Sequence, residues 1–127
     1  MPKPKLPAEQ NALASGPAQG QLVLKGRLWL EKNDKTFLSW GRVVLLERID
    51  REGSLSAAAR SMGMSYSHAW NLVEEMNCTA GEPLVAKQTG GSGGGGAVLT
   101  EAGRQAVARF WGLVDEFRQW LAQRNVG

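Results

Sequence analysis

Two short helices separated by a glycine-containing turn most strongly constrain the fold of this chain. Ser54 is suited to cap a helix over residues 55–62, and Gly63 interrupts that helix. Ser65 can then cap a second helix over residues 66–77. Two helices joined by about three residues, with glycine in the turn, are typical of a helix-turn-helix motif.

The second helix of this motif has one apolar face and one polar face. Its apolar positions follow the i, i+3, i+4, i+7 spacing of one helix face and are Ala69, Leu72, Val73 and Met76. Ser67 and Asn71 point away from this stripe, whereas Tyr66 and Trp70 lie nearer its edge. For Trp70, packing in the core is therefore the alternative to contact with a partner. The helix is predicted to pack on one side and to present polar side chains on the other.

A glycine run follows the motif, with six glycines among the seven residues 90–96. Residues 82–89 and 97–100 flank the run and are predicted to be strands. The run is not a phosphate-binding P-loop, which needs Lys and Ser or Thr after its last glycine, where this chain has Ala97 and Val98. It is not a dinucleotide fingerprint either, because a strand follows it. We predict the tip of a β-hairpin wing, with a flexible linker as the alternative.

The segment before the motif predicts a β-hairpin and a helix. Strands over residues 22–31 and 36–38 flank a plausible turn. Ser39 is expected to cap a helix over residues 40–51, with Gly53 just past its end. The residues of this helix that we expect to face inward are Val44, Leu45 and Ile49.

A long amphipathic helix is predicted over residues 101–124, with Thr100 as its cap. At 1.5 Å per residue it would span about 36 Å. Its apolar stripe is wider than one small core needs, which favours packing against a partner helix. The expected dimer-interface residues are Phe110, Leu113, Val114, Phe117, Trp120 and Leu121.

The length and composition favour one cytoplasmic domain without catalytic chemistry. The 127 residues suffice for a single core, expected over residues 21–127, preceded by a flexible tail over residues 1–20. One cysteine and one histidine provide neither a disulfide nor a zinc site, and a lone Cys78 suits a reducing compartment. No apolar run is long enough to cross a membrane. We expect no enzyme activity, no cofactor, no metal and no membrane contact.

The charge distribution neither demands nor excludes a nucleic-acid partner. The net charge is +3, yet residues 54–77 contain one arginine against two glutamates, and residues 78–100 contain one lysine against one glutamate. Phosphate contacts would then fall to helix N-termini, hydroxyls, glycine amides or basic residues elsewhere. The candidate basic residues elsewhere are Lys3, Lys5, Lys25, Arg27, Lys32 and Lys35.

Two segments carry a resemblance to a known family. "MSYSHAWNLVEEMN" and "PLVAKQTGGSGGGGAVLTEAGRQAV", with the spacing between them, closely resemble the N-terminal winged-helix domain of the molybdate-responsive ModE regulators. "GSLSAAARSMGMS" and "LTEAGR" more distantly resemble the DNA-binding domain of LysR-type regulators. The resemblance covers roughly residues 37–110. It implies a mainly α, α+β winged helix-turn-helix fold with an N-terminal β-hairpin, a glycine-rich wing and a long C-terminal dimerisation helix.

The resemblance also implies a homodimeric transcription regulator that binds double-stranded DNA. The second helix of the motif would enter the major groove, and by position its residues nearest DNA are Ser65, Tyr66, Ser67, His68, Trp70 and Asn71. The wing would contact the DNA backbone through Lys87, Thr89, Gly90, Gly91, Ser92, Gly93 and Gly94. Simple solvent exposure is the alternative for the polar members of both sets.

The link to molybdenum rests on the resemblance alone. Full-length ModE proteins carry C-terminal domains that bind molybdate, and this chain stops soon after the long helix, so we expect no molybdate binding by this chain. Two other hypotheses stay open. In the first, the domain is a protein-interaction module that pairs with another regulator through the long helix, as its weakly charged reading surface suggests. In the second, it is an anion-binding sensor in its own right.

Overall fold

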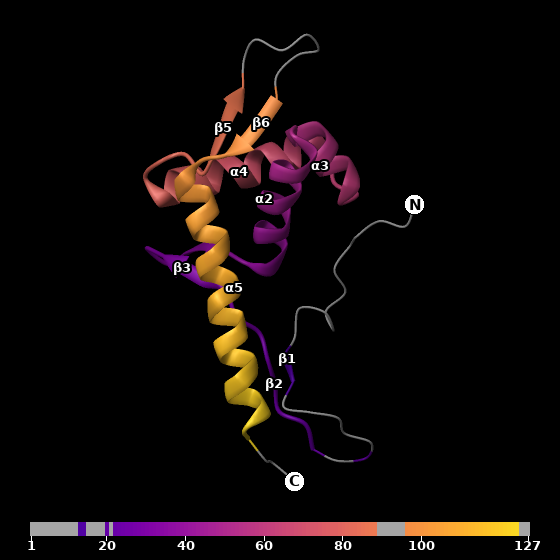
Figure 1. Cartoon of the computed structure of the whole chain (residues 1–127), viewed down its shortest axis with the longest axis vertical. Coiled ribbons are helices and arrows are strands. Elements are labelled where there is room, and N and C mark those ends of the chain that lie inside the picture. The colour runs from indigo at the N-terminus through magenta and orange to yellow at the C-terminus, as the bar shows by residue number, and fades with distance from the viewer. Residues whose placement is uncertain (1–12, 15–19, 21, 89–95, 125–127) are drawn as a thin grey trace.

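The computed structural model describes residues 13–14, 20, 22–88 and 96–124, and it shows a winged helix-turn-helix body from which one long helix extends (Figure 1). The helices are α2 (Trp40–Glu52), α3 (Leu55–Ser61), α4 (Tyr66–Ala80) and α5 (Glu101–Ala122). The strands form three antiparallel pairs: β1 (Leu13–Ala14) with β2 (Lys25–Gly26), β3 (Leu30–Lys32) with β4 (Lys35–Leu38), and β5 (Val85–Gln88) with β6 (Gly96–Leu99). This mainly α architecture confirms the predicted fold class.

Side-chain caps start all four helices where the sequence predicted them. The hydroxyls of Ser39, Ser54, Ser65 and Thr100 each accept a hydrogen bond from the backbone N–H three residues later, at 3.0–3.4 Å. Two helices end at glycines in the left-handed conformation, Gly53 with φ 78° and Gly81 with φ 77°. Helix α4 therefore extends three residues beyond its expected end, because Gly81 supplies the left-handed cap.

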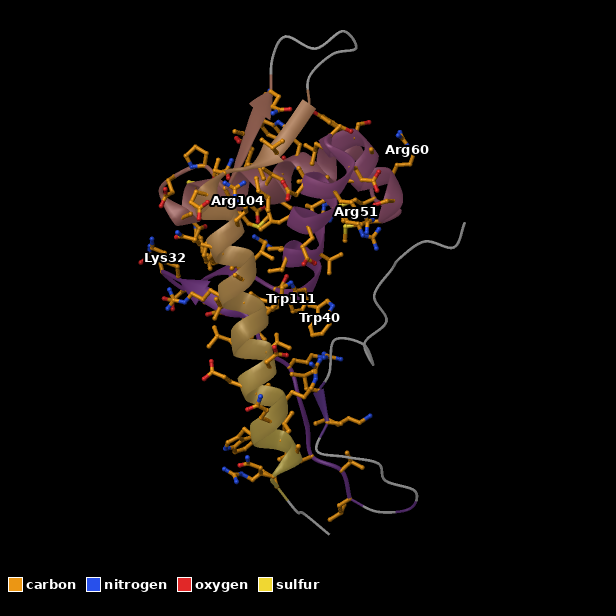
Figure 2. The ribbon with its side chains drawn as sticks, viewed as in Figure 1. Lys32, Trp40, Arg51, Arg60, Arg104 and Trp111 are labelled. Atoms are coloured by element: carbon orange, nitrogen blue, oxygen red, sulfur yellow. The ribbon has the colours of Figure 1, made fainter. Side chains whose placement is uncertain are left out.

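The first half of helix α5 contacts the body (Figure 1). Its second half contacts the strand pair β1–β2. Near the middle, the Trp111 indole N–H donates to Glu47 at 3.0 Å, and its ring meets Trp40 edge to face at 4.9 Å (Figure 2). Farther along, β1 lies against the helix. Gly26 of β2 lies so close to Phe117 that an added Cβ would come within 2.7 Å of the ring. These contacts hold α5 to its own chain along much of its length.

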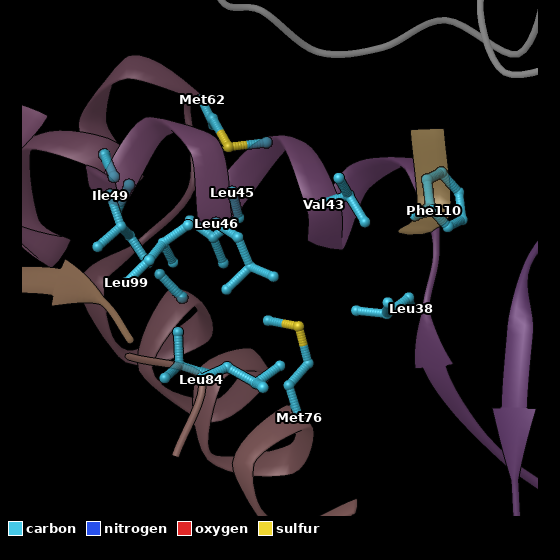
Figure 3. Packing of buried hydrophobic residues seen from close by; sticks show 14 of the residues in the cluster. Leu38, Val43, Leu45, Leu46, Ile49, Met62, Met76, Leu84, Leu99 and Phe110 are labelled. Carbon is cyan, nitrogen blue, oxygen red and sulfur yellow. The ribbon is translucent and has the colours of Figure 1, made fainter. Parts of the chain in front are cut away.

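The core lies between α2, α4, the wing and α5 (Figure 3), and it continues along α5 as far as Leu121. Its largest fully buried side chains are Phe110, Leu38, Leu45, Leu46, Ile49, Met76, Leu84, Leu121, Val43 and Val114. Of the residues predicted to face inward, Leu45 and Ile49 are fully buried and Val44 packs against the core while partly buried. The fully buried Val43 and Leu46 were not predicted. Helix α2 contacts α3, β6 and α5, so its buried face is wider than one stripe.

The β3–β4 hairpin is shorter than the hairpin predicted over residues 22–38. The strand expected over residues 22–31 is two short strands with different partners, β2 and β3. Its turn lies where it was expected, with Asn33 and Asp34 both in the left-handed region. Strand β4 ends at Leu38 because Ser39 starts α2, so β3 has no partner before Leu30.

The flexible tail was predicted over residues 1–20, but Leu13 and Ala14 within it pair with Gly26 and Lys25 of β2. Leu13 is buried in the core cluster, which accounts for its fixed position. Apart from Gly20, the other residues of the predicted tail lie outside the described residues. No helix within the described part of the chain is long and apolar enough to span a membrane.

Candidate nucleic-acid interface

The N-terminal end of α4 gathers the predicted reading residues on one exposed surface. Ser65 caps the helix by accepting from the His68 N–H at 3.1 Å, and its hydroxyl lies 3.3 Å from that of Ser67. The side chains exposed at this end are Ser65, Tyr66, Ser67, His68, Trp70 and Asn71. The backbone N–H groups and the dipole of a helix N-terminus favour negative charge. This end of α4 therefore combines an anion-attracting terminus with hydroxyl, imidazole and amide groups.

Scaffold contacts fix the opposite face of α4. Ala69, Val73 and Met76 are buried, as the stripe predicted, whereas Leu72 is partly exposed. The Asn77 side chain accepts a hydrogen bond from the Leu84 N–H at 2.8 Å, tying the end of the helix to the chain that enters the wing. The buried side chains and the bond at Asn77 thus hold α4 on the body, with its opposite face exposed.

Two aromatic side chains of α4 lie between the helix and the wing. Tyr66 is 53% exposed and Trp70 is 41% exposed, so Trp70 is not a core residue. Both line a groove of about 580 Å³ whose other wall includes Val85 and Ala97 of the wing strands. Their rings offer apolar contact area beside the polar end of the helix.

The wing is attached to the end of α2. The backbone N–H of Ala97 donates to the Gly53 carbonyl at 2.9 Å, and that of Leu99 donates to the Asp50 carboxylate at 3.4 Å. Strand β5 pairs with β6 over four residues, from Val85 opposite Leu99 to Gln88 opposite Gly96. Lys87 is exposed on this hairpin. The other predicted wing contacts, Thr89, Gly90, Gly91, Ser92, Gly93 and Gly94, lie outside the described residues.

Two exposed arginines, one on α2 and one on α3, were not among the basic residues singled out from the sequence. Arg51 and Arg60 are exposed on the α2–α3 side of the body (Figure 2). Arg51 contacts its neighbour Glu52 at 3.4 Å, and no side chain in the described ranges forms an ion pair with Arg60. Counting charges from residue 54 onward omitted Arg51, although its place in the last turn of α2, just before the motif, was a usable signal.

The basic residues proposed elsewhere are not gathered at the start of α4. Lys32 lies at the turn of the β3–β4 hairpin, on the opposite side of the body from Arg60 (Figure 2). Lys25 belongs to β2, which runs beside the far half of α5 (Figure 1). Lys3 and Lys5 lie outside the described residues. Of the basic side chains considered, Lys87 lines the groove with Tyr66 and Trp70 of α4, and Arg60 lies in the last turn of α3, just before the turn that leads to α4.

The six predicted dimer-interface residues divide into two groups. Phe110, Val114 and Leu121 are fully buried within their own chain and cannot touch a partner without leaving this packing. Leu113 and Phe117 are half-buried, and Trp120 is 45% exposed. The rings of Phe117 and Trp120 stack at 6.1 Å, and the Arg124 guanidinium lies 4.3 Å from the centre of the Trp120 ring. The candidate surface on α5 is therefore narrower than the apolar stripe suggested.

The described residues contain no cluster of three or more His, Cys, Asp or Glu side chains suited to a metal ion. Cys78 is a free, exposed thiol on α4. The imidazole of His68 is exposed in the first turn of the same helix. The chemistry concentrated at this site is hydrogen bonding and anion attraction.

Comparison with known proteins places the same segments in a family. The model of the bacterial regulatory helix-turn-helix proteins of the lysR family matches residues 40–104. The chain is 43% identical over 95 residues to the molybdenum transport protein ModE of Azotobacter vinelandii, covering 75% of this chain and 35% of the relative. It is 51% identical over 69 residues to the molybdenum-pterin-binding protein MopB of Rhodobacter capsulatus, covering 54% and 26%.

A third relative is the DNA-binding transcriptional dual regulator ModE of Escherichia coli K12, 39% identical over 92 residues that cover 72% of this chain and 35% of the relative. The chain thus spans about a third or less of the length of these relatives. These matches confirm the resemblance inferred from the motifs. The family match runs from the start of α2 into α5, includes the reading helix and the wing strands, and covers more than half of the chain. The chain belongs to the lysR family of bacterial regulatory helix-turn-helix proteins.

Proposed function

We propose that this chain binds double-stranded DNA in a sequence-specific manner and regulates transcription. The observation that carries the proposal is the exposed, Ser65-capped N-terminus of α4, which stands clear of the core beside a wing. A helix-turn-helix motif places the N-terminal residues of its second helix against base edges in the major groove. Family membership and the curated relatives support the same assignment.

In this proposal, Ser67 and Asn71 read the bases. Both are exposed on the face of α4 opposite the buried Ala69 and Val73. An asparagine side chain can donate to and accept from adenine in a bidentate pair, and a serine hydroxyl can pair with any base. His68 and Tyr66 are additional hydrogen-bonding groups of the same turn.

Phosphate contacts position the domain on the duplex. The candidate phosphate contacts are the N–H groups at the start of α4 and the exposed cations Arg60 and Lys87. The glycine amides of the sequence between the wing strands would add contacts that need no side chain. With few cations, the phosphate term of a single domain is modest. Binding of two domains to adjoining half-sites would then be needed for tight association.

The proposed assembly is a homodimer that binds two-fold symmetric sites. The surface of α5 that includes Leu113, Phe117 and Trp120 is the candidate contact between copies. A two-fold dimer reads two half-sites related by the same symmetry. Because the reading surface carries little positive charge, the alternative is that the same face of α5 pairs with a different regulator.

The proposed biological setting is a bacterial cytoplasm and the control of molybdenum-related genes. This link comes from the names of the relatives, a molybdenum transport protein and molybdenum-pterin-binding proteins. We propose no molybdate site within this chain. Titration of the purified chain with molybdate or tungstate should produce no heat and no change in melting temperature, and a saturable signal would contradict this part of the proposal.

Selection of binding sites from a random duplex pool, at low and at higher salt, tests the proposed function. We expect enrichment of one two-fold symmetric site whose binding survives an increase in salt better than that of the starting pool. Weak binding without enrichment that disappears with salt would contradict sequence-specific recognition and favour the protein-interaction alternative. Mixing the chain with a full-length relative, followed by separation by size, would then test that alternative.

A further inference from the structure

The C-terminus of α3 is held by an arginine from another helix. Arg48 of α2 places its Nη1 atom 2.9 Å from the Ser61 hydroxyl oxygen and 3.3 Å from the Ser61 carbonyl oxygen. The Ser61 hydroxyl in turn donates to the Ala58 carbonyl at 2.8 Å. Among the hydrogen bonds of the described residues, those of Arg48 are the ones that join α2 to the end of α3.

This contact lies at the entrance to the turn between the two helices of the motif. Ser61 is the last residue of α3, and Ser65, four residues later, caps α4. Within the turn, the Gly63 N–H donates to the Arg60 carbonyl at 3.1 Å, and the Met64 N–H donates to the Ala59 carbonyl at 3.0 Å. These bonds fix the turn relative to α3. The contact from Arg48, beside the packing of the buried Ala58 and Ala59, ties the end of α3, and with it the turn, to α2.

The chemistry suits a fixed joint. The last carbonyls of a helix lack intrahelical donors, and a cation at this end also interacts favourably with the helix dipole. A hydrogen bond from a charged donor is about twice as strong as one between neutral groups. Arg48 is partly buried with its guanidinium engaged at Ser61, unlike the exposed Arg51 and Arg60.

We propose that Arg48 is a positioning residue for DNA recognition, acting through Ser61 to set the direction of the reading helix. This inference rests on the proposed function. Bonds between side chains and base edges require accurate placement of α4, whereas attraction to phosphates tolerates small rotations. Loosening the joint therefore weakens specific binding selectively and leaves non-specific binding in place.

The test compares four variants on the duplex recovered by site selection and on a scrambled duplex of equal length. R48M is expected to lower affinity for the selected duplex about tenfold, the scale of one charged hydrogen bond, and to change affinity for the scrambled duplex less than twofold. S61A removes only the bond to the hydroxyl and should give a loss no larger than that of R48M, and R48M/S61A should lose no more than R48M. R48K should restore most of the affinity, because a lysine amine can donate to the same two oxygens.

The salt dependence separates positioning from direct contact with DNA. The slope of log affinity against log salt should stay at the wild-type value in R48M, because no phosphate contact is lost. If the slope instead becomes less negative by about 0.9, Arg48 contacts a phosphate directly, and this result would overturn the proposal. The matched control is R51M, an exposed arginine three residues along the same helix, which should leave the ratio of specific to scrambled affinity unchanged.

A measurement without DNA keeps this proposal distinct from the proposed function. Amide exchange at Gly63 and Met64 in the free protein should become about tenfold faster in R48M and S61A, as expected for loss of one charged hydrogen bond, but not in R51M. Unchanged exchange in R48M and S61A would overturn the proposal whether or not the wild type selects a site. If exchange becomes faster in R48M and S61A as expected, but the wild type selects no site, the result would contradict the proposed function and leave the role of Arg48 in the fold intact.

Discussion

Gly103 shows how closely the structure depends on single residues. It is buried in the first turn of α5, where a Cβ atom would overlap the carbonyl oxygen of Leu84 and come within 3.3 Å of the Leu99 Cβ. The obstructing atom belongs to the backbone and cannot rotate away. Gly112, nine residues along the same helix, is exposed, and an added Cβ there would meet no atom within 4 Å.

The two glycines therefore predict opposite effects of the same substitution. G103A should lower the free energy of unfolding by about 3 kcal/mol, because α5 must shift away from Leu84. G112A should raise it by about 0.5–1 kcal/mol through helix propensity. Denaturant unfolding of both variants measures the difference. Equal effects would mean that α5 does not cross the Leu84 segment this closely.

A substitution at Ser65 can distinguish folding from DNA binding, because aspartate keeps the helix cap and adds a negative charge. S65D should retain stability, since aspartate is a good N-cap and its charge suits the helix dipole. The same charge at the reading end of α4 should repel phosphates and lower affinity for a selected duplex at least about tenfold. Thermal unfolding and fluorescence anisotropy measure the two effects.

The control for this change is S39D, which places the same charge at the N-cap of α2. Because Ser39 follows β4, which packs beside the C-terminal half of α4 and away from Ser65, S39D should retain wild-type affinity. An equal loss in S39D and S65D would indicate a general effect of net charge and argue against a DNA contact at the start of α4.

Local signals explain why some residues were predictable and others were not. Each N-cap was identified because capping depends on a few consecutive residues. The burial of Val43 and Leu46, which was not predicted, depends on which elements surround α2, and no short-range pattern contains that information. The bonds of Arg48 to Ser61 join residues 13 apart and lacked any motif to point to them.

At the scale of elements, Arg42 joins three pieces of the fold. From α2 it donates to the Thr36 carbonyl in β4 at 3.3 Å and to the Glu75 carboxylate in α4 at 2.8 Å. The Arg42 side chain is mostly buried, whereas that of Glu75 is exposed. The N-terminal hairpin is thereby connected to the helix-turn-helix unit through one guanidinium.

Removal of either partner should have unequal effects. R42M should lower the free energy of unfolding by about 1–2 kcal/mol, because it leaves the Thr36 carbonyl without its donor. E75Q should lower it by about 0.5 kcal/mol or less, because Glu75 is exposed and water screens its charge. Denaturant unfolding of the two variants provides the comparison. A larger loss in E75Q would show that the ion pair, and not the carbonyl bond, joins these elements.

Predictions of elements succeeded where one segment carries its own pattern. The helix-turn-helix, the wing strands and α5 follow from periodicity and caps, and each is present. The strand expected over residues 22–31 failed because pairing depends on partners elsewhere in the chain: β4 is too short to extend it, and β2 pairs with Leu13 and Ala14. A strand without a visible partner is the least secure element to assign from sequence.

At the scale of the whole molecule, the second half of α5 extends from the body (Figure 1). On this half Trp120 is exposed, and its ring stacks on that of Phe117. If two copies meet there, W120E should convert a dimer into a monomer by burying a charge in an apolar contact. Analytical ultracentrifugation at several concentrations measures the change. Q119E adds the same charge to the exposed neighbour and should remain dimeric. A monomeric wild type, or a W120E variant that still dimerises, would contradict this contact.

The central claim is that the exposed end of α4 reads base sequence. Its most direct test is the ratio of affinities for the selected duplex and for a scrambled duplex, measured for the wild type and for S67A/N71A. Both side chains are exposed, so the substitutions should leave the melting temperature within about 2 °C. We expect the ratio to fall to near one in S67A/N71A while binding to the scrambled duplex is retained. A ratio that stays at the wild-type value would contradict sequence reading by this helix.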